Sequence, residues 1–368
     1  MSAAAPKFTI RTFYRALMVF LVGWILAFPA CDSGPPPPLP DDAKIPSPTD
    51  LGQFEPEIKT AFINAQAKVR AQPDAANWAN LARIYHAHEQ LDNAIESYRE
   101  AMDAGDDSNR TPHLLALALD ETGDRDAAIE SMTRASRQQP AYAPSFWRLG
   151  QWQLEAGNMD AADQAMQFAM EIAPEDPATL QAYGKYLIDT GRSAEAIKPL
   201  VMLANQQKGN AYARFLLGTA LVQADREDEG RAQLELGRGS KPVWTDQHVL
   251  DVAAMTTGPR AEFLRLAAEC DAGNAQGTLP KLLQLEPRLG DDPNYHVQIA
   301  KAYRMIKQMD DAEHWLQQAL ELDDQHVSAS YQLAGLYRDR WHAQADKTET
   351  AHLESALARA DLVLELNQ

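Results

Sequence analysis

The histidines and cysteines are the side chains of this sequence that most readily support chemistry. His86 and His88 are two positions apart in a predicted helix, where residues i and i+2 face different directions, so the pair makes a poor metal site. Cys31 and Cys270 are the two cysteines, too few for a disulfide framework or a Cys-x-x-Cys zinc site. No basic residue lies next to Cys270 to activate its thiol, and we expect a small buried side chain there.

Sequence motifs of enzymes are missing from the chain. It contains no Gly-x-Ser-x-Gly, His-Glu-x-x-His, phosphate-loop or Gly-x-Gly-x-x-Gly pattern. The formal net charge of −18 argues against nonspecific binding of nucleic acid, which needs a basic surface. We therefore expect a protein that is not an enzyme, with no catalytic residues, no cofactor, no metal and no nucleic-acid partner.

Residues 1–30 have the layout of a bacterial export signal. Residues 1–15 carry three basic side chains and no acid, and an uncharged apolar run follows that is short for a membrane-spanning helix. Cys31 comes directly after Ala30, which resembles a lipoprotein signal and implies lipidation of Cys31. An uncleaved anchor and ordinary secretion are the alternatives. All three predict the periplasmic side of the bacterial cell envelope, and the first two predict attachment to a membrane, inner or outer.

Residues 31–54 form a proline-rich segment. Proline fixes φ and removes a backbone donor, so this composition predicts an extended linker rather than a domain. A spacer and a proline-rich ligand for a partner are both compatible with it.

Small residues recur along the chain at intervals of 34 residues. They fall within predicted helices whose large apolar residues follow the i, i+3, i+4, i+7 pattern. Two antiparallel helices can approach closely at such positions, and stacking of successive hairpins covers the apolar face that one hairpin leaves open. The first series is Ala82, Ala116, Gly150, Gly184 and Gly218, and the second is Ala94, Ala128, Ala162, Ala196 and Gly230.

This pattern resembles the tetratricopeptide repeat family. The resemblance implies an all-α fold, an α-α superhelix of about eight helical hairpins, one of them degenerate. The register is lost at 243–255, where we expect an extra helix. The predicted segments after the linker are a capping helix at 55–74, five regular units at 75–242, a degenerate region at 243–292, and two further units at 293–368, the last with an insertion.

The resemblance also places the first helix of each unit on a concave groove. Six predicted wall positions are basic and only Asp120 is acidic, while large apolar side chains occupy the middle units. We expect exposed aromatic residues there to bind a peptide with acidic flanks or a free carboxylate, the alternative being that the superhelix itself or residues 55–71 cover them. The predicted groove residues are Arg83, Arg110, Trp147, Gln151, Lys185, Tyr212, Phe215, Lys301, Arg304 and Arg338.

These features together predict a membrane-tethered scaffold that binds an unidentified protein or peptide partner. Two alternatives stay open: a structural assembly factor of a pilus or secretion type, and an accessory subunit of an envelope enzyme or cytochrome system. The sequence leaves the oligomeric state open.

Overall fold

The computed structural model describes most of the chain after the linker. The predicted signal or anchor, the lipidation residue Cys31 and most of the insertion in the last unit lie outside the described residues. Described are residues 37–40, 44–240, 242, 244–343, 354, 358 and 361.

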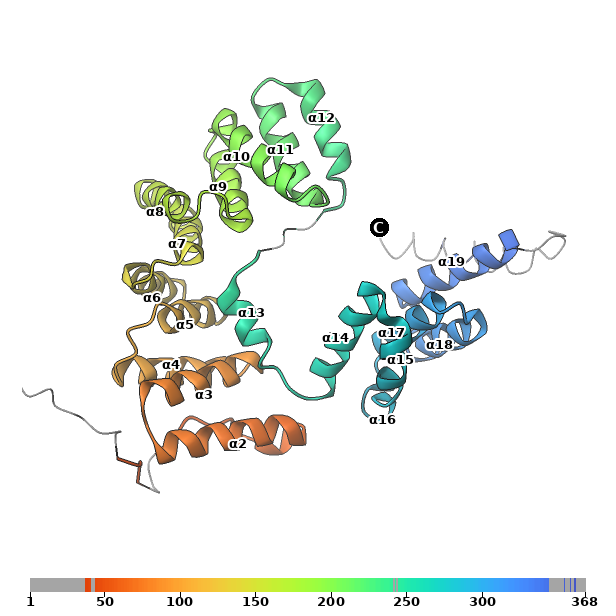
Figure 1. The fold of residues 1–368 in the computed structure, drawn as a ribbon, viewed down its shortest axis with the longest axis horizontal. Coiled ribbons are helices and arrows are strands. Elements are labelled where there is room, and N and C mark those ends of the chain that lie inside the picture. The colour runs from red at the N-terminus through yellow and green to blue at the C-terminus, as the bar shows by residue number, and fades with distance from the viewer. Residues whose placement is uncertain are drawn as a thin grey trace, which may run out of the picture.

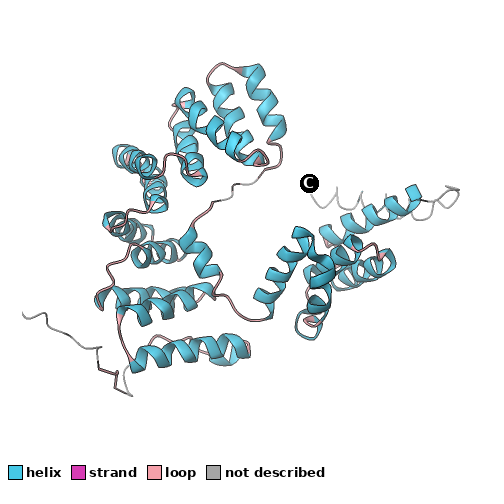
Figure 2. Cartoon of the chain, viewed as in Figure 1, coloured by secondary structure: helices cyan, strands magenta, loops and turns pink. Residues whose placement is uncertain are grey.

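Every regular element of the described residues is helical, as Figures 1 and 2 show. A 3-10 turn, η1 (Leu51–Gln53), precedes α2 (Pro56–Ala71), which lies within the predicted capping segment. Five hairpins follow: α3 (Ala75–Ala87) with α4 (Leu91–Asp103), α5 (Arg110–Glu121) with α6 (Arg125–Arg137), α7 (Ala143–Glu155) with α8 (Met159–Ile172), α9 (Pro177–Asp189) with α10 (Ser193–Gln206), and α11 (Ala211–Gln223) with α12 (Glu227–Leu236).

The second half of the described chain is less regular. The extra helix expected at 243–255 is α13 (Gln247–Ala253). The remaining elements are α14 (Pro259–Glu269), the π-helical turn η2 (Cys270–Asn274), α15 (Ala275–Leu283), α16 (Glu286–Leu289), α17 (Pro293–Met305), α18 (Met309–Leu322) and α19 (Val327–Ala343).

Local sequence signals start several of these helices. Asp74, Asp176 and Asn210 are N-cap residues whose side-chain oxygens accept a hydrogen bond from the backbone N–H three residues later. Such a cap satisfies one of the free donors at a helix start, and loss of one costs about 1 kcal/mol.

The small repeated positions lie where paired helices touch. A Cβ added to Gly184 would lie 2.4 Å from a methyl carbon of Leu200, and one added to Gly218 would lie 2.8 Å from the backbone nitrogen of Leu234. Distances this short are incompatible with ordinary van der Waals contact. The repeated small residues therefore set the spacing within each hairpin.

After α12 the chain does not continue the stack but turns back. Helices α2 to α12 form a curved array, and α13 packs against α3 and α5 on the inner side of that curve, as Figure 1 shows. Val252 of α13 belongs to the same apolar core as α2 to α6. Helices α14 to α19 then form a second helical array with cores of its own.

Candidate peptide-binding groove

The inner face of the first array holds a segment of the same chain. We call residues 244–253 the cis segment; it consists of three residues without regular structure followed by α13, whose N-cap is Asp246. It contacts side chains from α5 and α7 and from the loops that precede them. The segment therefore crosses the surface where the sequence predicts a partner.

The carboxylate of Asp246 is the centre of this contact. Its two oxygens accept hydrogen bonds from His113 Nε2 at 2.9 Å and from the Tyr142 hydroxyl at 2.8 Å, and Arg148 Nε lies 3.4 Å away. Asp246 is 1% exposed. Burial alone would raise the pKa of Asp246, but the hydrogen bond from His113, the charge of Arg148 and the hydrogen bond from Tyr142 hold it well below its usual value. The site thus keeps a buried acid ionised.

His248, two residues further on, is held in its neutral form. Arg110 Nε donates to its Nδ1 at 3.2 Å, so the ring proton is on Nε2, which lies 3.0 Å from the Asn109 side-chain oxygen. The ring stacks on Tyr142 with centroids 4.0 Å apart. Burial lowers the pKa of His248 to about 4, helped by the nearby His113 and Arg110. A charged imidazole is therefore disfavoured in this position.

Ion pairing and stacking extend the contact to both ends of the cis segment. At its α13 end, Arg110 pairs with Asp251 at 2.5 Å. At its other end, Trp244 stacks on Trp147 with ring centroids 5.4 Å apart, and the guanidinium carbon of Arg148 lies 4.9 Å from the Trp147 ring centre. The groove thus offers two aromatic rings, Trp147 and Tyr142, together with cationic and polar donors.

Ser145, His113 and Asp246 form a hydrogen-bonded chain that resembles a hydrolase triad in composition only. Ser145 Oγ lies 2.8 Å from His113 Nδ1, and His113 Nε2 faces the carboxylate. All three side chains are buried, and Ser145 and His113 are fully so. A nucleophile needs access to a substrate, and these buried side chains have none. The hydrogen bonds therefore hold the cis segment in place.

The predicted groove residues fall into different settings. Arg110 contacts the cis segment directly. Trp147 is fully buried, so the expectation that it is exposed on the groove wall is wrong. Self-coverage, the alternative for the aromatic residues, applies to Trp147, and the covering residue is Trp244 of the cis segment rather than one from residues 55–71. Arg83 is half-buried, and burial together with the Arg110 charge lowers its pKa.

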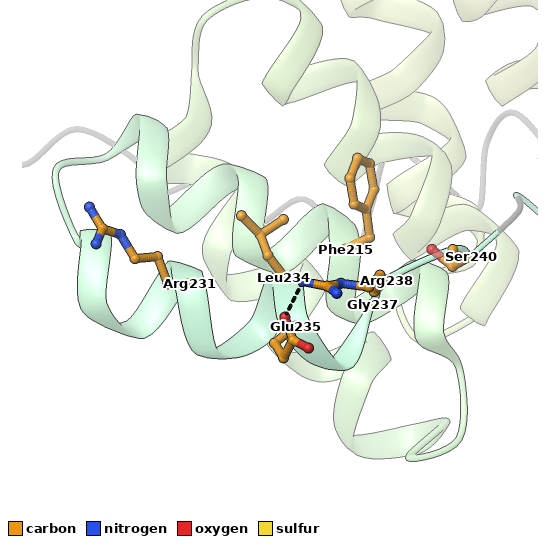
Figure 3. A pocket seen from close by; sticks show the side chains of 8 residues that line it. Phe215, Arg231, Leu234, Glu235, Gly237, Arg238 and Ser240 are labelled. Atoms are coloured by element: carbon orange, nitrogen blue, oxygen red, sulfur yellow. Dashed lines mark hydrogen bonds and ion pairs between the residues drawn. The ribbon is translucent and has the colours of Figure 1, made fainter. Parts of the chain in front are cut away.

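The predicted residues on α7, α9 and α11 keep more exposure. Gln151 and Lys185 are half-buried, and Lys185 pairs with Asp189 of its own helix at 2.5 Å. Tyr212 and Phe215 stack with centroids 6.0 Å apart. Phe215 is 42% exposed and lines a shallow cavity of about 500 Å³ with residues of α12 and the loop after it, as Figure 3 shows.

The basic residues predicted at the far end of the groove lie in the second array and have acidic partners. Lys301 pairs with Asp271 at 2.7 Å. Arg304 and Arg338 both contact Asp339, at 3.5 and 3.1 Å. The ten predicted residues therefore do not line one groove, because the chain crosses back between the two arrays.

Sequence reasoning missed the residues that make the closest contacts. His113, Tyr142 and Arg148 line the groove, and Trp244 and Asp246 fill it. The loss of repeat register at 243–255 indicated an inserted element, and the aromatic and acidic residues at its start were the available signal that it binds something.

Among the described residues, no group of three or more His, Cys, Asp or Glu side chains is placed to hold a metal ion. In the same part of the chain, no helix combines the length and the apolar character that crossing a membrane requires. Cys270 is buried.

Comparison with known proteins supports the repeat assignment. A family model described as tetratricopeptide repeat matches residues 75–104, 113–142 and 293–326. Comparison with the curated proteins gives no match.

Solved structures of repeat proteins are similar to parts of the chain at low identity. One is described as YrrB, a TPR protein with an unusual peptide-binding site; it is 18% identical, with 53% of this chain and 98% of that chain covered and a TM-score of 0.42. PilF of Pseudomonas aeruginosa is 17% identical, with coverage of 54% and 90% and a TM-score of 0.43. The structure described as MamA is 18% identical, with coverage of 44% and 89% and a TM-score of 0.40. The matches of the family model show tetratricopeptide repeats within this chain, and proteins built from such repeats act as protein–protein interaction scaffolds.

Proposed function

We propose that this protein is a non-enzymatic scaffold that binds a partner protein or peptide on the inner face of its first array. The observation that carries the proposal is the occupied groove. An inner face that holds ten residues of peptide through Asp246, Trp244 and His248 has the donors and the aromatic surface that peptide recognition needs.

The inner face beyond the cis segment supplies further binding surface. Gln151, Lys185 and Tyr212 lie on the first helices of the third, fourth and fifth hairpins, and each is half-buried rather than covered. A partner seated there would lie next to the cis segment.

Site-specific photo-crosslinking tests the scaffold. A photoreactive amino acid replaces Gln151 or Lys185 on the inner face, and Gln167, exposed on α8, serves as the matched outer position. We expect adducts with another protein from the inner positions only. Adducts from Gln167 alone, or adducts only between copies of this chain, would instead favour an assembly factor that works through its outer surface.

We further propose that the scaffold is attached to an envelope membrane through lipid on Cys31. The support is the sequence layout of residues 1–31, a basic start followed by an apolar run, a small residue and cysteine. Replacement of Cys31 by Ser should abolish incorporation of a labelled fatty acid and release the protein from the membrane fraction. If the wild-type protein incorporates no labelled fatty acid, Cys31 is not lipidated, even if the variant leaves the membrane fraction. If the Cys31→Ser variant stays in the membrane fraction, an uncleaved anchor is favoured.

A further inference from the structure

We infer that the groove formed by Asn109, Arg110, His113, Tyr142, Trp147 and Arg148 is a binding site for acidic peptides carrying an aromatic residue two positions before an aspartate, and that the cis segment occupies this site until a partner peptide of that chemistry displaces it. This inference rests on the proposed scaffold function and names its ligand and its regulation.

The aspartate requirement follows from the buried carboxylate. A carboxylate removed from water is tolerated only where charged and polar donors replace the water. His113 on α5, Arg148 on α7 and Tyr142 at the N-cap of α7 supply those donors, at positions that converge on Asp246. An amide offers one acceptor oxygen in place of two and no charge for Arg148, and an apolar side chain offers no acceptor, so the groove selects an acid.

The aromatic requirement follows from the spacing of the two contacts. The flat face of Trp147 is covered by Trp244, and Arg148 contacts both the Trp147 ring and the Asp246 carboxylate. Because one guanidinium spans both contacts, the distance between the aromatic ring and the acid is fixed. One residue, Thr245, separates Trp244 from Asp246, and the backbone of Asp246 is extended.

The α13 end adds a preference for a helical turn with a second acid. Asp246 caps α13 through the backbone N–H groups of His248 and Val249 while it accepts from the groove. Asp251 then reaches Arg110 from the next turn of the helix. The site therefore recognises a peptide with an aromatic residue, any one residue and then an aspartate. The aspartate begins a helix that carries a second acid five positions after it.

The cis segment leaves part of the site unsatisfied. Trp147 Nε1 is a buried donor with no hydrogen-bond partner in the described structure. A buried donor without an acceptor weakens an association. A partner peptide that brings an acceptor to this atom would bind the site better than the cis segment does.

Both ends of the cis segment join irregular chain, which lets it leave without disturbing the repeats. The described residues between α12 and α13 (237–240, 242 and 244–246) are not helical, and Gly258, with φ of +94°, precedes α14. On leaving, the segment gives up the groove contacts, the packing of Val252, and the contacts of Thr256 and Thr257 with Ala87 and His88. The curved array itself is held by its own hairpin cores.

A labelled copy of the cis segment tests the site in the full-length protein. The probe is a fluorescein-labelled peptide of residues 242–253, PVWTDQHVLDVA, followed by anisotropy. Asp246→Asn in the protein weakens the tethered competitor and leaves the groove intact. We expect this variant to bind the probe about tenfold or more tightly than the wild type, because the tethered segment occupies most wild-type grooves.

Matched substitutions assign the binding to this groove. Adding Arg148→Glu to Asp246→Asn should abolish binding, whereas adding Arg231→Glu, the same charge change at an exposed site on α12, should leave it unchanged. Peptides with the tryptophan or the first aspartate replaced by alanine should bind at least tenfold more weakly, as each removes one of the two anchors.

Several outcomes would overturn the inference. One is a folded Asp246→Asn protein, checked by circular dichroism, that binds the probe no more tightly than the wild type. If that variant does not fold, Asp251→Asn, which removes the charge of the partly exposed pair with Arg110 and leaves Asp246 in place, gives the same comparison. Arg148-dependent dimers of either variant in place of probe binding would identify the occupant as a second copy of the chain and contradict a partner peptide.

The inference and the scaffold fail in different ways. If the probe does not bind but Gln151 and Lys185 give adducts with another protein, the proposed peptide ligand is refuted and the proposed scaffold function is supported. If the probe binds but the inner positions give no adducts with another protein, the proposed peptide-binding site is supported and the proposed scaffold function is refuted.

Discussion

At the scale of single residues, Gly218 has no room for a side chain. A Cβ there would lie 2.8 Å from Leu234 N and 2.9 Å from Gly230 O, both backbone atoms that move only if helices α11 and α12 separate. Alanine would favour the helix by about 1 kcal/mol, but overpacking of a core costs about 1–3 kcal/mol. The steric cost should exceed the gain because the contacts are with backbone.

We therefore predict that Gly218→Ala lowers the free energy of unfolding by about 1 kcal/mol or more, measured by denaturant titration. Gly209→Ala is the control, since nothing lies within 4 Å of a Cβ at Gly209. A Gly218→Ala protein as stable as the wild type would show that the hairpin is not closely packed there.

The same residues show what sequence reasoning can supply. Residues such as Gly184 and Gly218 recur at a fixed interval, and the interval alone predicted that helices touch there, as the structure confirms. Trp147 was predicted on the same wall but is buried, because its partner Trp244 lies 97 residues further along the chain and outside the repeat. A periodic pattern cannot show a contact made by a residue that does not belong to it.

At the scale of elements, the docking of α13 depends on two neutral histidines. His248 has its pKa lowered to about 4, and burial lowers the pKa of His113, whose closest charged neighbours are Asp246 and Arg148. Both groups bind protons more readily once the cis segment has left. Docking is thus fully favoured above the ordinary histidine pKa of about 6.5, and it weakens as the pH falls from there toward 4.

We predict that lowering the pH from 6.5 to 5 increases the open population of the cis segment by about tenfold. Hydrogen exchange of the backbone amides of α13, corrected for intrinsic rates, measures this. His248→Gln, which does not titrate in this range, should show a smaller pH-dependent change, and any change that is left belongs to His113. An identical pH dependence in the variant would contradict the role of His248.

The helices could be predicted from the sequence, but the position at which α13 docks could not. The hairpins α3 to α12 follow from the repeat, and the loss of register indicated α13. Its docking site could not be found in the same way, because Arg110 and His248 are 138 positions apart and no local pattern links them. Ion pairs and stacking between distant segments are settled by the whole fold.

At the scale of the whole molecule, the second array is attached to the start of the first. Arg288, at the C-terminal end of α16, pairs with Glu57 at 2.8 Å and with Glu55 at 3.2 Å, both next to the start of α2. The Arg288 hydrogen bond is the main cause that lowers the pKa of Glu57 to about 2. The pair therefore persists as the pH falls through the histidine range and is lost only on approach to pH 2, which separates it from the opening of the cis segment.

This junction bears on how the two arrays are placed, because among the described residues between α12 and α14 the regular structure is limited to α13. We predict that Arg288→Glu places three acids together, parts the two arrays and increases the radius of gyration measured by small-angle X-ray scattering. Thermal stability should change little, since exposed ion pairs contribute little to folding.

Arg238→Glu is the matched control, because Arg238 pairs with Glu235 of the preceding helical turn and does not link the two arrays. Adding Glu57→Arg to Arg288→Glu restores an opposite-charge pair and should bring the radius of gyration back. If the scattering of Arg288→Glu superimposes on that of the wild type, the arrays are held by the cis segment alone, and breaking its contact with Arg148 should then part them.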